Sequence, residues 1–289
     1  MIRAMTSLHK GLLYGLLAVL AFSLTLPATR LAVAQLDPLF VGLGREVLAA
    51  VLAAPLLWFT RQPWPNTAQW RTLLWVIGGV VLGFPVFTAL AMNKADASHG
   101  AVVLGLLPLA TAVAGFLLNH ERPSGRFWLA AIVGSAAVIA YAVSAGSGRL
   151  LPADLALLGA VMAGAMGYAA GARLARELGA WQVICWAVVA AAPFLLPVVL
   201  WLAWRHGLQA TPQAWGAFAY VSSVSAFLGF FAWYRGLDLG GVARVSQVML
   251  LQPFFTLGFA ALWLGERVTP LAIACAALVA LTLVVSRRA

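Results

Sequence analysis

Charged side chains are scarce in this sequence. Asp, Glu, Lys and Arg make up 9% of its 289 residues and hydrophobic residues 63%, whereas an ordinary soluble domain carries about 25% charged residues. This deficit excludes an ordinary soluble globular protein. Because a helix needs roughly 20 apolar residues to cross a ~30 Å hydrocarbon layer, a chain of this length can hold about ten spans joined by short loops. No room is left for a soluble domain.

Cysteines are few, and the motifs of several common enzyme classes are missing. Cys185 and Cys275 lie in apolar runs without a CxxC spacing or a Cys/His companion, so neither a disulfide framework nor a metal site is indicated. The sequence contains no P-loop, HExxH or GxSxG pattern, which argues against an ATP-driven pump, a metalloprotease and a serine hydrolase. We therefore expect no cofactor, no bound metal and no enzymatic activity.

Ten apolar runs are long enough to be transmembrane helices. They are numbered here as the first to the tenth span and lie at residues 11–29, 38–60, 70–92, 97–118, 126–145, 153–173, 181–204, 214–235, 242–263 and 268–286. A transmembrane β-barrel would need short segments of alternating apolar and polar residues, and runs such as 130–141 are apolar on every side. The sequence therefore predicts an all-α polytopic membrane protein.

The distribution of Lys and Arg predicts the orientation of these spans, because cytoplasmic loops collect positive charge. If the N-terminus is cytoplasmic, the cytoplasmic segments hold eleven Lys and Arg residues and the opposite segments hold five. Arg45 and Arg244 are not counted because they fall within predicted spans. Both termini are therefore predicted to be cytoplasmic, in a cell inner membrane. The net charge of +10 reflects this topology beside an anionic leaflet, and we expect no nucleic-acid partner.

The two halves of the chain resemble each other. The matches are collinear: Pro108, Glu121 and Arg122 recur 145 residues later as Pro253, Glu266 and Arg267, Leu82-Gly83-Phe84 recurs as Leu228-Gly229-Phe230, and Arg30-Leu31-Ala32 recurs as Arg173-Leu174-Ala175. They predict two repeats, residues 1–147 and 148–289. The first span also resembles a signal peptide, but its apolar core is long and the repeat requires it as the partner of the sixth span.

Each predicted repeat holds five spans, and an odd number forces the second copy into the membrane upside down. Inverted repeats around a central cavity are typical of transporters that work by alternating access. The alternative is that duplication merely builds a large helical bundle, as in some channels.

A proline in the fourth span of each half, followed by a glutamate at the end of that span, places the sequence near a known family. Pro108 precedes Asn119-His120-Glu121, and Pro253 precedes Leu264-Gly265-Glu266. With ten spans and an inverted duplication, the chain resembles the EamA branch of the drug/metabolite transporter superfamily. The resemblance implies a cavity lined by the first, third, fourth, sixth, eighth and ninth spans, with the fifth and tenth peripheral. Bacterial members export amino acids and other small metabolites.

Polar, aromatic and small residues on those six spans are the candidates for binding a small amphiphilic solute, because ligand pockets are mostly apolar with a few placed polar groups. They are Tyr14, Phe22, Ser23, Thr25, Gly83, Asn93, His99, Pro108, Tyr168, Ser222, Gly229, Tyr234, Gln247 and Gln252. Packing between helices is the alternative role for each residue taken singly.

Prolines and glycines in the spans predict the shape of the bundle. Pro27, Pro85, Pro108 and Pro253 should kink their helices and free backbone carbonyls. Three glycine pairs at small-xxx-small spacing should allow close helix contacts: Gly11 with Gly15, Gly79 with Gly83, and Gly167 with Gly171.

Charged residues inside spans are costly and need a reason. Arg45 and Glu46 are neighbours in the second span, and because successive helical residues point about 100° apart, we expect them not to pair with each other. Arg45 is expected to be a structural anchor or a contact for a substrate carboxylate, and the alternative is that its side chain snorkels toward the membrane interface. His99 and Arg244 align in the repeat, which predicts a cation near each mouth of the cavity.

The sequence as a whole predicts an inner-membrane secondary transporter that exports a small metabolite, with amino acids favoured. The open alternatives are another solute class (a sugar or nucleotide sugar, or an organic cation), an intramembrane enzyme acting on lipid head groups, and a sensor or assembly protein without flux. Glu46 and His99 are the candidate proton carriers and both are poorly sited, so we expect no obligatory proton. The expected partners are the substrate and the bilayer, with the protein a monomer or weak homodimer.

Overall fold

The computed structural model describes residues 2–119, 125–145, 150–240 and 246–287, which form helices joined by short turns, with no strand among them. The predicted landmarks Glu121, Arg122 and Arg244 lie outside these residues. Seven helices are long and apolar enough to cross a membrane, and three shorter apolar helices, Ile132–Ser144, Val248–Leu264 and Pro270–Thr282, fall in the fifth, ninth and tenth predicted spans.

The helices follow the predicted spans in order, and several spans are built from more than one segment. The first half contains α1 Ile2–Ser23, α2 Thr25–Val33, α3 Pro38–Phe59, α4 Thr67–Val76, η1 Ile77–Gly83, α5 Phe84–Met92, α6 Ala97–Leu104, α7 Leu107–Asn119 and α8 Gly125–Ala145. The second half contains α9 Pro152–Leu178, α10 Ala180–His206, α11 Pro212–Tyr220, η2 Val221–Leu228, α12 Gly229–Gly240, η3 Ser246–Leu251, α14 Gln252–Leu264 and α15 Pro270–Arg287.

Local sequence signals set several helix ends. The Asp37 side chain accepts a hydrogen bond from the Phe40 backbone N–H at the start of α3, and Asn66 and Gln69 form a reciprocal capping box at the start of α4. Gly179 separates α9 from α10 with a φ of 92°, a conformation that glycine adopts without steric cost. The polypeptide therefore turns sharply between two long helices.

Four spans are interrupted just before the prolines that were predicted to kink them. Pro27 follows the turn at Leu24 between α1 and α2, and Pro85 follows the π-helical segment η1. Pro108 follows a turn between α6 and α7, and Pro253 follows the 3-10 segment η3. Each proline thus sits in the first turn of a new segment, where its missing N–H costs no helical hydrogen bond.

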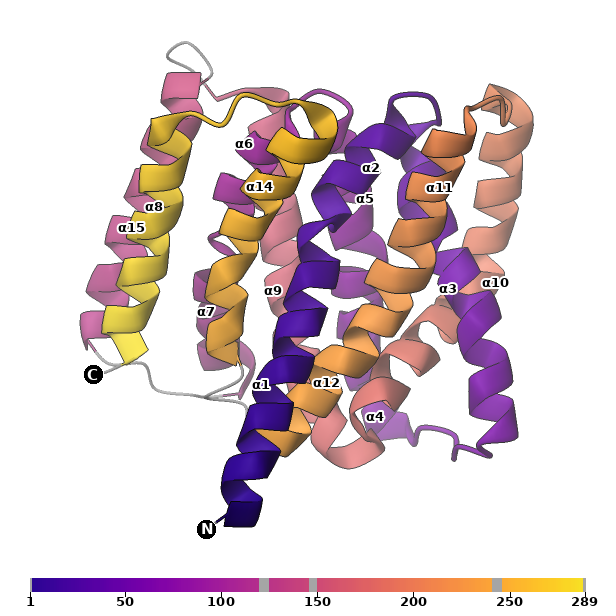
Figure 1. Cartoon of the computed structure of the whole chain (residues 1–289). Helices are drawn as coiled ribbons and strands as arrows, with labels where there is room; N and C mark the ends of the chain where they lie inside the picture. Colours follow the sequence, from indigo (N-terminus) through magenta and orange to yellow (C-terminus); the bar gives the residue numbers. More distant parts are fainter. Residues whose placement is uncertain (1, 120–124, 146–149, 241–245, 288–289) are drawn as a thin grey trace.

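Helices from the two halves pack in pairs. α1 runs along α12, α3 along α10, and the third span, formed by α4, η1 and α5, along α9. α8 and α15 pack together at one side of the bundle (Figure 1). α1 begins and α15 ends at the lower end in this view, whereas α2 and α14 both end at the upper end.

Small residues allow the closest of these contacts. A Cβ added at Gly79 would lie 2.4 Å from the Ala163 carbonyl oxygen and 2.7 Å from the Gly167 backbone nitrogen, so these backbones touch. A Cβ added at Gly236 would lie 2.8 Å from the Gly15 backbone nitrogen and 2.9 Å from the Gly11 carbonyl oxygen. Glycines of all three predicted pairs, except Gly83 and Gly171, therefore take part in these two backbone contacts.

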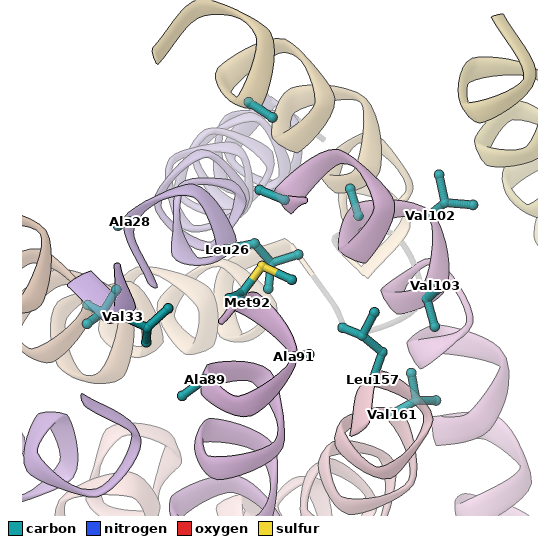
Figure 2. Close-up of a cluster of buried hydrophobic side chains, with 14 of the residues drawn as sticks. Leu26, Ala28, Val33, Ala89, Ala91, Met92, Val102, Val103, Leu157 and Val161 are labelled. Carbon is teal, nitrogen blue, oxygen red and sulfur yellow. The ribbon is translucent and has the colours of Figure 1, made fainter. Parts of the chain in front are cut away.

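A buried apolar cluster fixes the upper end of the bundle. Figure 2 shows Leu26 of α2 beside Met92 of α5, with Val102 of α6 pointing away from them, and a Cβ added at Gly100 would lie within 4 Å of Leu26, Met92 and Leu157 of α9. All four side chains are buried. They belong to one buried cluster, which joins α2, α5, α6 and α9 through van der Waals packing, because burial from water does not drive helix association in lipid.

Candidate functional site

A cavity opens between the helices near the middle of the bundle. The space between its lining side chains totals about 990 Å³, which includes space open to solvent. Its wall includes residues from the first, third, fourth, sixth, eighth and ninth spans, as the resemblance implied. Three further helices also contribute: α3 through Arg45 and Glu46, α10 through Ile184, and α15 through Ala276, Val279 and Ala280. The expectation that the tenth span is wholly peripheral is therefore wrong.

The only charged side chains on this wall, among the residues that the structure describes, are Arg45 and Glu46. They are 5% and 2% exposed, and the Arg45 Nε lies 3.1 Å from the Glu46 Oε1. The prediction that these neighbours do not pair is wrong. Helix geometry fixes only the direction of each Cβ, and the long arginine stem folds its guanidinium back over the next residue. Burial favours this pairing because water is not available to solvate either charge.

Two hydroxyl groups extend this pair across the cavity. The Arg45 Nη2 donates to the Ser225 Oγ at 3.4 Å, and the Ser225 Oγ lies 2.7 Å from the Thr25 Oγ1. Ser225 belongs to the π-helical segment η2. Such segments are rare and occur frequently at functional sites. The second, first and eighth spans thus meet through one polar chain.

Aromatic rings form the adjoining wall. The ring centroids of Phe22 and Phe230 are 5.2 Å apart, and those of Tyr168 and Phe230 are 6.5 Å apart. Phe84 completes this wall. The arrangement offers one neutral pair of opposite charges beside a large apolar surface, which suits a small solute that is both charged and apolar.

Four of the fourteen predicted cavity residues line the cavity: Phe22, Thr25, Tyr168 and Gln252. Pro253, predicted as a kink, also lies on the wall. The Ser23 Oγ donates to the Val19 carbonyl and, at 3.3 Å, to the Gln252 carbonyl, so it packs behind the wall. The side chains of Pro108, Tyr234 and Gln247 lie outside what the structure describes.

The other predicted residues that the structure describes are not among those that line the cavity. Ser222 donates to the Phe218 carbonyl within its own helix, and Tyr14 and Asn93 are exposed. A Cβ at Gly83 would lie 2.6 Å from the Ala163 Cβ, and one at Gly229 would lie 2.7 Å from a ring carbon of Phe22. These two glycines are packing positions, so bulky replacements there will disturb helix contacts as well as any transport path.

His99 is held in a side-chain contact at the upper end of the bundle. Its Nε2 lies 2.5 Å from the Oδ1 of buried Asp154, and its ring stacks on Tyr141 at 5.3 Å between centroids. The contact joins α6 to α9. His99 is therefore a structural link between the two halves and does not lie on the cavity wall.

A second polar cluster at this end involves Glu266, one of the repeated glutamates. Its two carboxylate oxygens accept hydrogen bonds from the backbone N–H groups of Ala97 and Ser98, each at 2.8 Å, at the start of α6. The Arg30 Nε lies 3.6 Å from the Glu266 carboxylate, and Arg30 Nη2 donates to Asp96 at 2.8 Å. We call Arg30, Asp96 and Glu266 the end cluster. It ties α2 and the loop after α14 to the start of the fourth span.

Sequence reasoning missed Ser225, Asp96 and the function of Arg30 in this cluster. Arg30 and Glu266 both belonged to repeated motifs, which marked them as special without identifying their partners. Ser225 lies four residues before the repeated Gly229, and nothing in its local sequence distinguishes it from Ser222 or Ser223.

Comparisons with known proteins agree with this architecture. The sequence profile of the EamA-like transporter family matches residues 9–143 and 151–288. The uncharacterized transporter YdeK of Bacillus subtilis (strain 168) is 44% identical over 272 residues, covering 91% of this chain and 92% of that protein. A probable terminal-alkyne amino-acid exporter of Streptantibioticus cattleyicolor is 27% identical over 292 residues, covering 97% and 95%.

A solved crystal structure has the same fold. It superimposes with a TM-score of 0.67 at 18% sequence identity, over 96% of this chain and 97% of the other. With the profile matching both halves and a relative this similar over nearly its full length, the chain belongs to the EamA-like transporter family, and it is a membrane-embedded member of a family of transporters.

Proposed function

We propose that this protein is an inner-membrane secondary transporter that exports small metabolites, with amino acids as its substrate class, by alternating access. The observation that carries the proposal is the central cavity, with its neutral pair of buried opposite charges beside aromatic walls. The relative named as a probable amino-acid exporter supports the substrate class.

Alternating access rests on ten spans arranged as two inverted repeats, residues 1–147 and 148–289, with both termini cytoplasmic. The family profile matches twice, once in each half. The two π-helical segments, which begin at Ile77 and Val221, recur 144 residues apart. The first span packs on the eighth, and the sixth packs on the third. Helix contacts of this symmetry support two equivalent halves that exchange shapes around a central site.

The end cluster supports a conformation in which the upper end is closed. Arg30, Asp96 and Glu266 link the first, third, fourth and ninth spans there, and the His99 contact with Asp154 adds the sixth. In the proposed orientation this end is extracellular. Substrate release to the outside then requires these polar contacts to separate.

Transport by reconstituted vesicles tests the proposal. Purified protein in liposomes preloaded with one unlabelled solute should take up the same labelled solute by saturable counterflow, and we expect this for apolar amino acids. Protein-free liposomes are the control. Saturable counterflow of only a sugar, a nucleotide sugar or an organic cation would replace amino acids with that class, and no saturable flux of any solute would refute a transporter.

An intramembrane enzyme acting on lipid head groups remains the second candidate in another class. The same vesicles, made with labelled phospholipids, would then release a modified head group in proportion to the protein. We expect the lipids to be recovered unchanged after counterflow has gone to completion.

A further inference from the structure

The charges of Arg45 and Glu46 are buried but incompletely satisfied. In the described part of the chain, the Arg45 Nε has no hydrogen-bond partner, although it lies 3.1 Å from the Glu46 carboxylate. The remaining contact of the guanidinium, to the Ser225 Oγ, is long at 3.4 Å. A guanidinium carries five donors in a planar fork that matches a carboxylate. The two charges thus neutralise each other, and the guanidinium fork can still bind a carboxylate.

We propose that Arg45 and Glu46 together form the receptor for the head group of a zwitterionic α-amino acid. The Arg45 guanidinium binds the substrate carboxylate, and the Glu46 carboxylate binds the substrate ammonium. The apolar side chain of the substrate lies against Phe22, Tyr168 and Phe230. This inference rests on the proposed transport of amino acids and specifies which groups of the substrate are recognised and by which residues.

The balance of charge favours a zwitterion over the other solute classes. A zwitterion supplies a counter-charge to each member of the pair, so the pair can separate without leaving a buried charge unpaired. An organic cation would satisfy Glu46 and leave Arg45 unpaired, and an anion would do the reverse. Either arrangement is strongly unfavourable in a buried site. A neutral sugar supplies no charge to replace the internal pair, and the aromatic wall offers it few polar partners.

Ser225 and Thr25 have a positioning function in this proposal. The Ser225 Oγ accepts from the guanidinium and lies within hydrogen-bond distance of the Thr25 hydroxyl. The two hydroxyls therefore hold Arg45 in place when the Glu46 carboxylate turns to the substrate. They connect the receptor to the first and eighth spans, which lie on opposite sides of the proposed repeat.

Ligand derivatives test the receptor directly. L-Leucine suits the apolar wall, leucinamide lacks the carboxylate and N-acetyl-L-leucine lacks the ammonium. Counterflow of labelled L-leucine should be inhibited by L-leucine much more strongly than by either derivative. Glu46→Gln should weaken the affinity for L-leucine by roughly thirtyfold or more, because one charge of a buried pair is left without its partner. The affinity of the same variant for N-acetyl-L-leucine should fall far less. Arg45→Gln should weaken the affinity for L-leucine to a similar extent and leave the affinity for leucinamide nearly unchanged.

A matched pair of substitutions controls for loss of charge alone. Arg176 and Glu177 are also neighbours on a helix, in the last turn of α9, and both are exposed. Arg176→Gln and Glu177→Gln should leave the affinity for all three ligands within about twofold, as surface substitutions usually perturb little. If loss of any charge on a helix lowered the affinity, the substitutions at Arg176 and Glu177 would lower it as much as those at Arg45 and Glu46.

Two results would overturn the receptor. One is an unchanged affinity for L-leucine in Glu46→Gln or Arg45→Gln, and the other is an equal loss for all three ligands in both variants, which marks a structural ion pair. If the single variants do not fold, thermal unfolding of the wild-type protein in detergent decides the question. L-Leucine should raise its Tm and the two derivatives should not, and equal Tm shifts from all three would refute the receptor.

The outcome for wild-type protein separates this inference from the proposed function. Saturable L-leucine counterflow in the wild type with unaltered selectivity in the variants would leave amino-acid transport in place and remove the receptor. An absence of counterflow for every amino acid would refute the proposed substrate class itself.

Discussion

Glu266→Gln should weaken the closure of the upper end of the bundle. The carboxylate accepts two backbone N–H groups at 2.8 Å and lies near Arg30. Hydrogen bonds to charged groups contribute about 1.5–3 kcal/mol each and neutral ones about 0.5–1.5. A glutamine keeps one acceptor oxygen and replaces the other with an NH2 donor, so one bond is weakened by roughly 1 kcal/mol and the other is lost at a cost of at least about 1 kcal/mol. The contact with Arg30 is discounted because that side chain is partly exposed. The closed state should lose about 2 kcal/mol, roughly a thirtyfold shift toward opening.

Cysteine accessibility measures this shift. Ala226 is 2% exposed and lines the cavity, so Ala226→Cys reports whether the cavity is open. The native Cys185 and Cys275 are replaced by alanine in this background. In intact cells, a membrane-impermeant maleimide should label the reporter up to about thirtyfold faster when Glu266→Gln is present, in line with the energy change above.

Glu177→Gln is the control. Glu177 is exposed on α9, so this substitution removes the same charge at a site outside the end cluster. Equal labelling rates for Glu266→Gln and Glu177→Gln would refute the gating function of the cluster. Slower labelling in Glu266→Gln would show that the glutamate holds the cavity open.

Three further predictions concern packing, topology and coupling. Gly79→Leu should lower the Tm in detergent and the folded yield, because overpacking against the Ala163 and Gly167 backbones costs about 1–3 kcal/mol or more. Gly78→Leu is the control and should behave like wild type, because no described atom lies within 4 Å of a Cβ added there. Equal Tm values for the two variants would contradict the contact at Gly79. External maleimide should label Glu266→Cys and spare Glu121→Cys, whereas labelling of both would rule out inverted halves. L-Leucine flux in vesicles should be unaffected by an imposed membrane potential and should move no protons, and substrate-dependent acidification by the wild-type protein would overturn this.

Much of the fold follows from local sequence. Apolar length identified the helices, and the proline positions identified where spans are interrupted, because a proline lacks the N–H that a continuing helix requires. Glycine spacing identified faces that can approach closely, and Gly79 and Gly167 meet at such a contact. These signals reside in single segments, so they are readable before the tertiary structure is known.

The partners of polar groups could not be read in the same way. The Glu266 carboxylate binds the start of a helix nearly 170 residues earlier in the sequence, at the backbone of Ala97 and Ser98. No residue type encodes a backbone N–H partner, so the repeated glutamate was recognisable and its contact was not. The cavity wall likewise includes α15, because its contribution depends on how two halves assemble.

The position of Glu46 changes the argument about energy coupling. From the sequence, Glu46 is a candidate proton carrier that is poorly sited, because its span is not among those implied to line the cavity. Glu46 lies on the cavity wall, so that reason no longer holds. The pair with Arg45 supplies a different one. Here the Arg45 guanidinium lies 3.1 Å from the Glu46 carboxylate, and protonation of Glu46 alone would leave that buried cation without a counter-charge. When a zwitterion binds, each charge exchanges one partner for another, so the net charge of the site stays zero in the loaded and the empty transporter. In the proposed mechanism neither form carries an unpaired charge through the low-dielectric interior, so we expect the return of the carrier to require no proton.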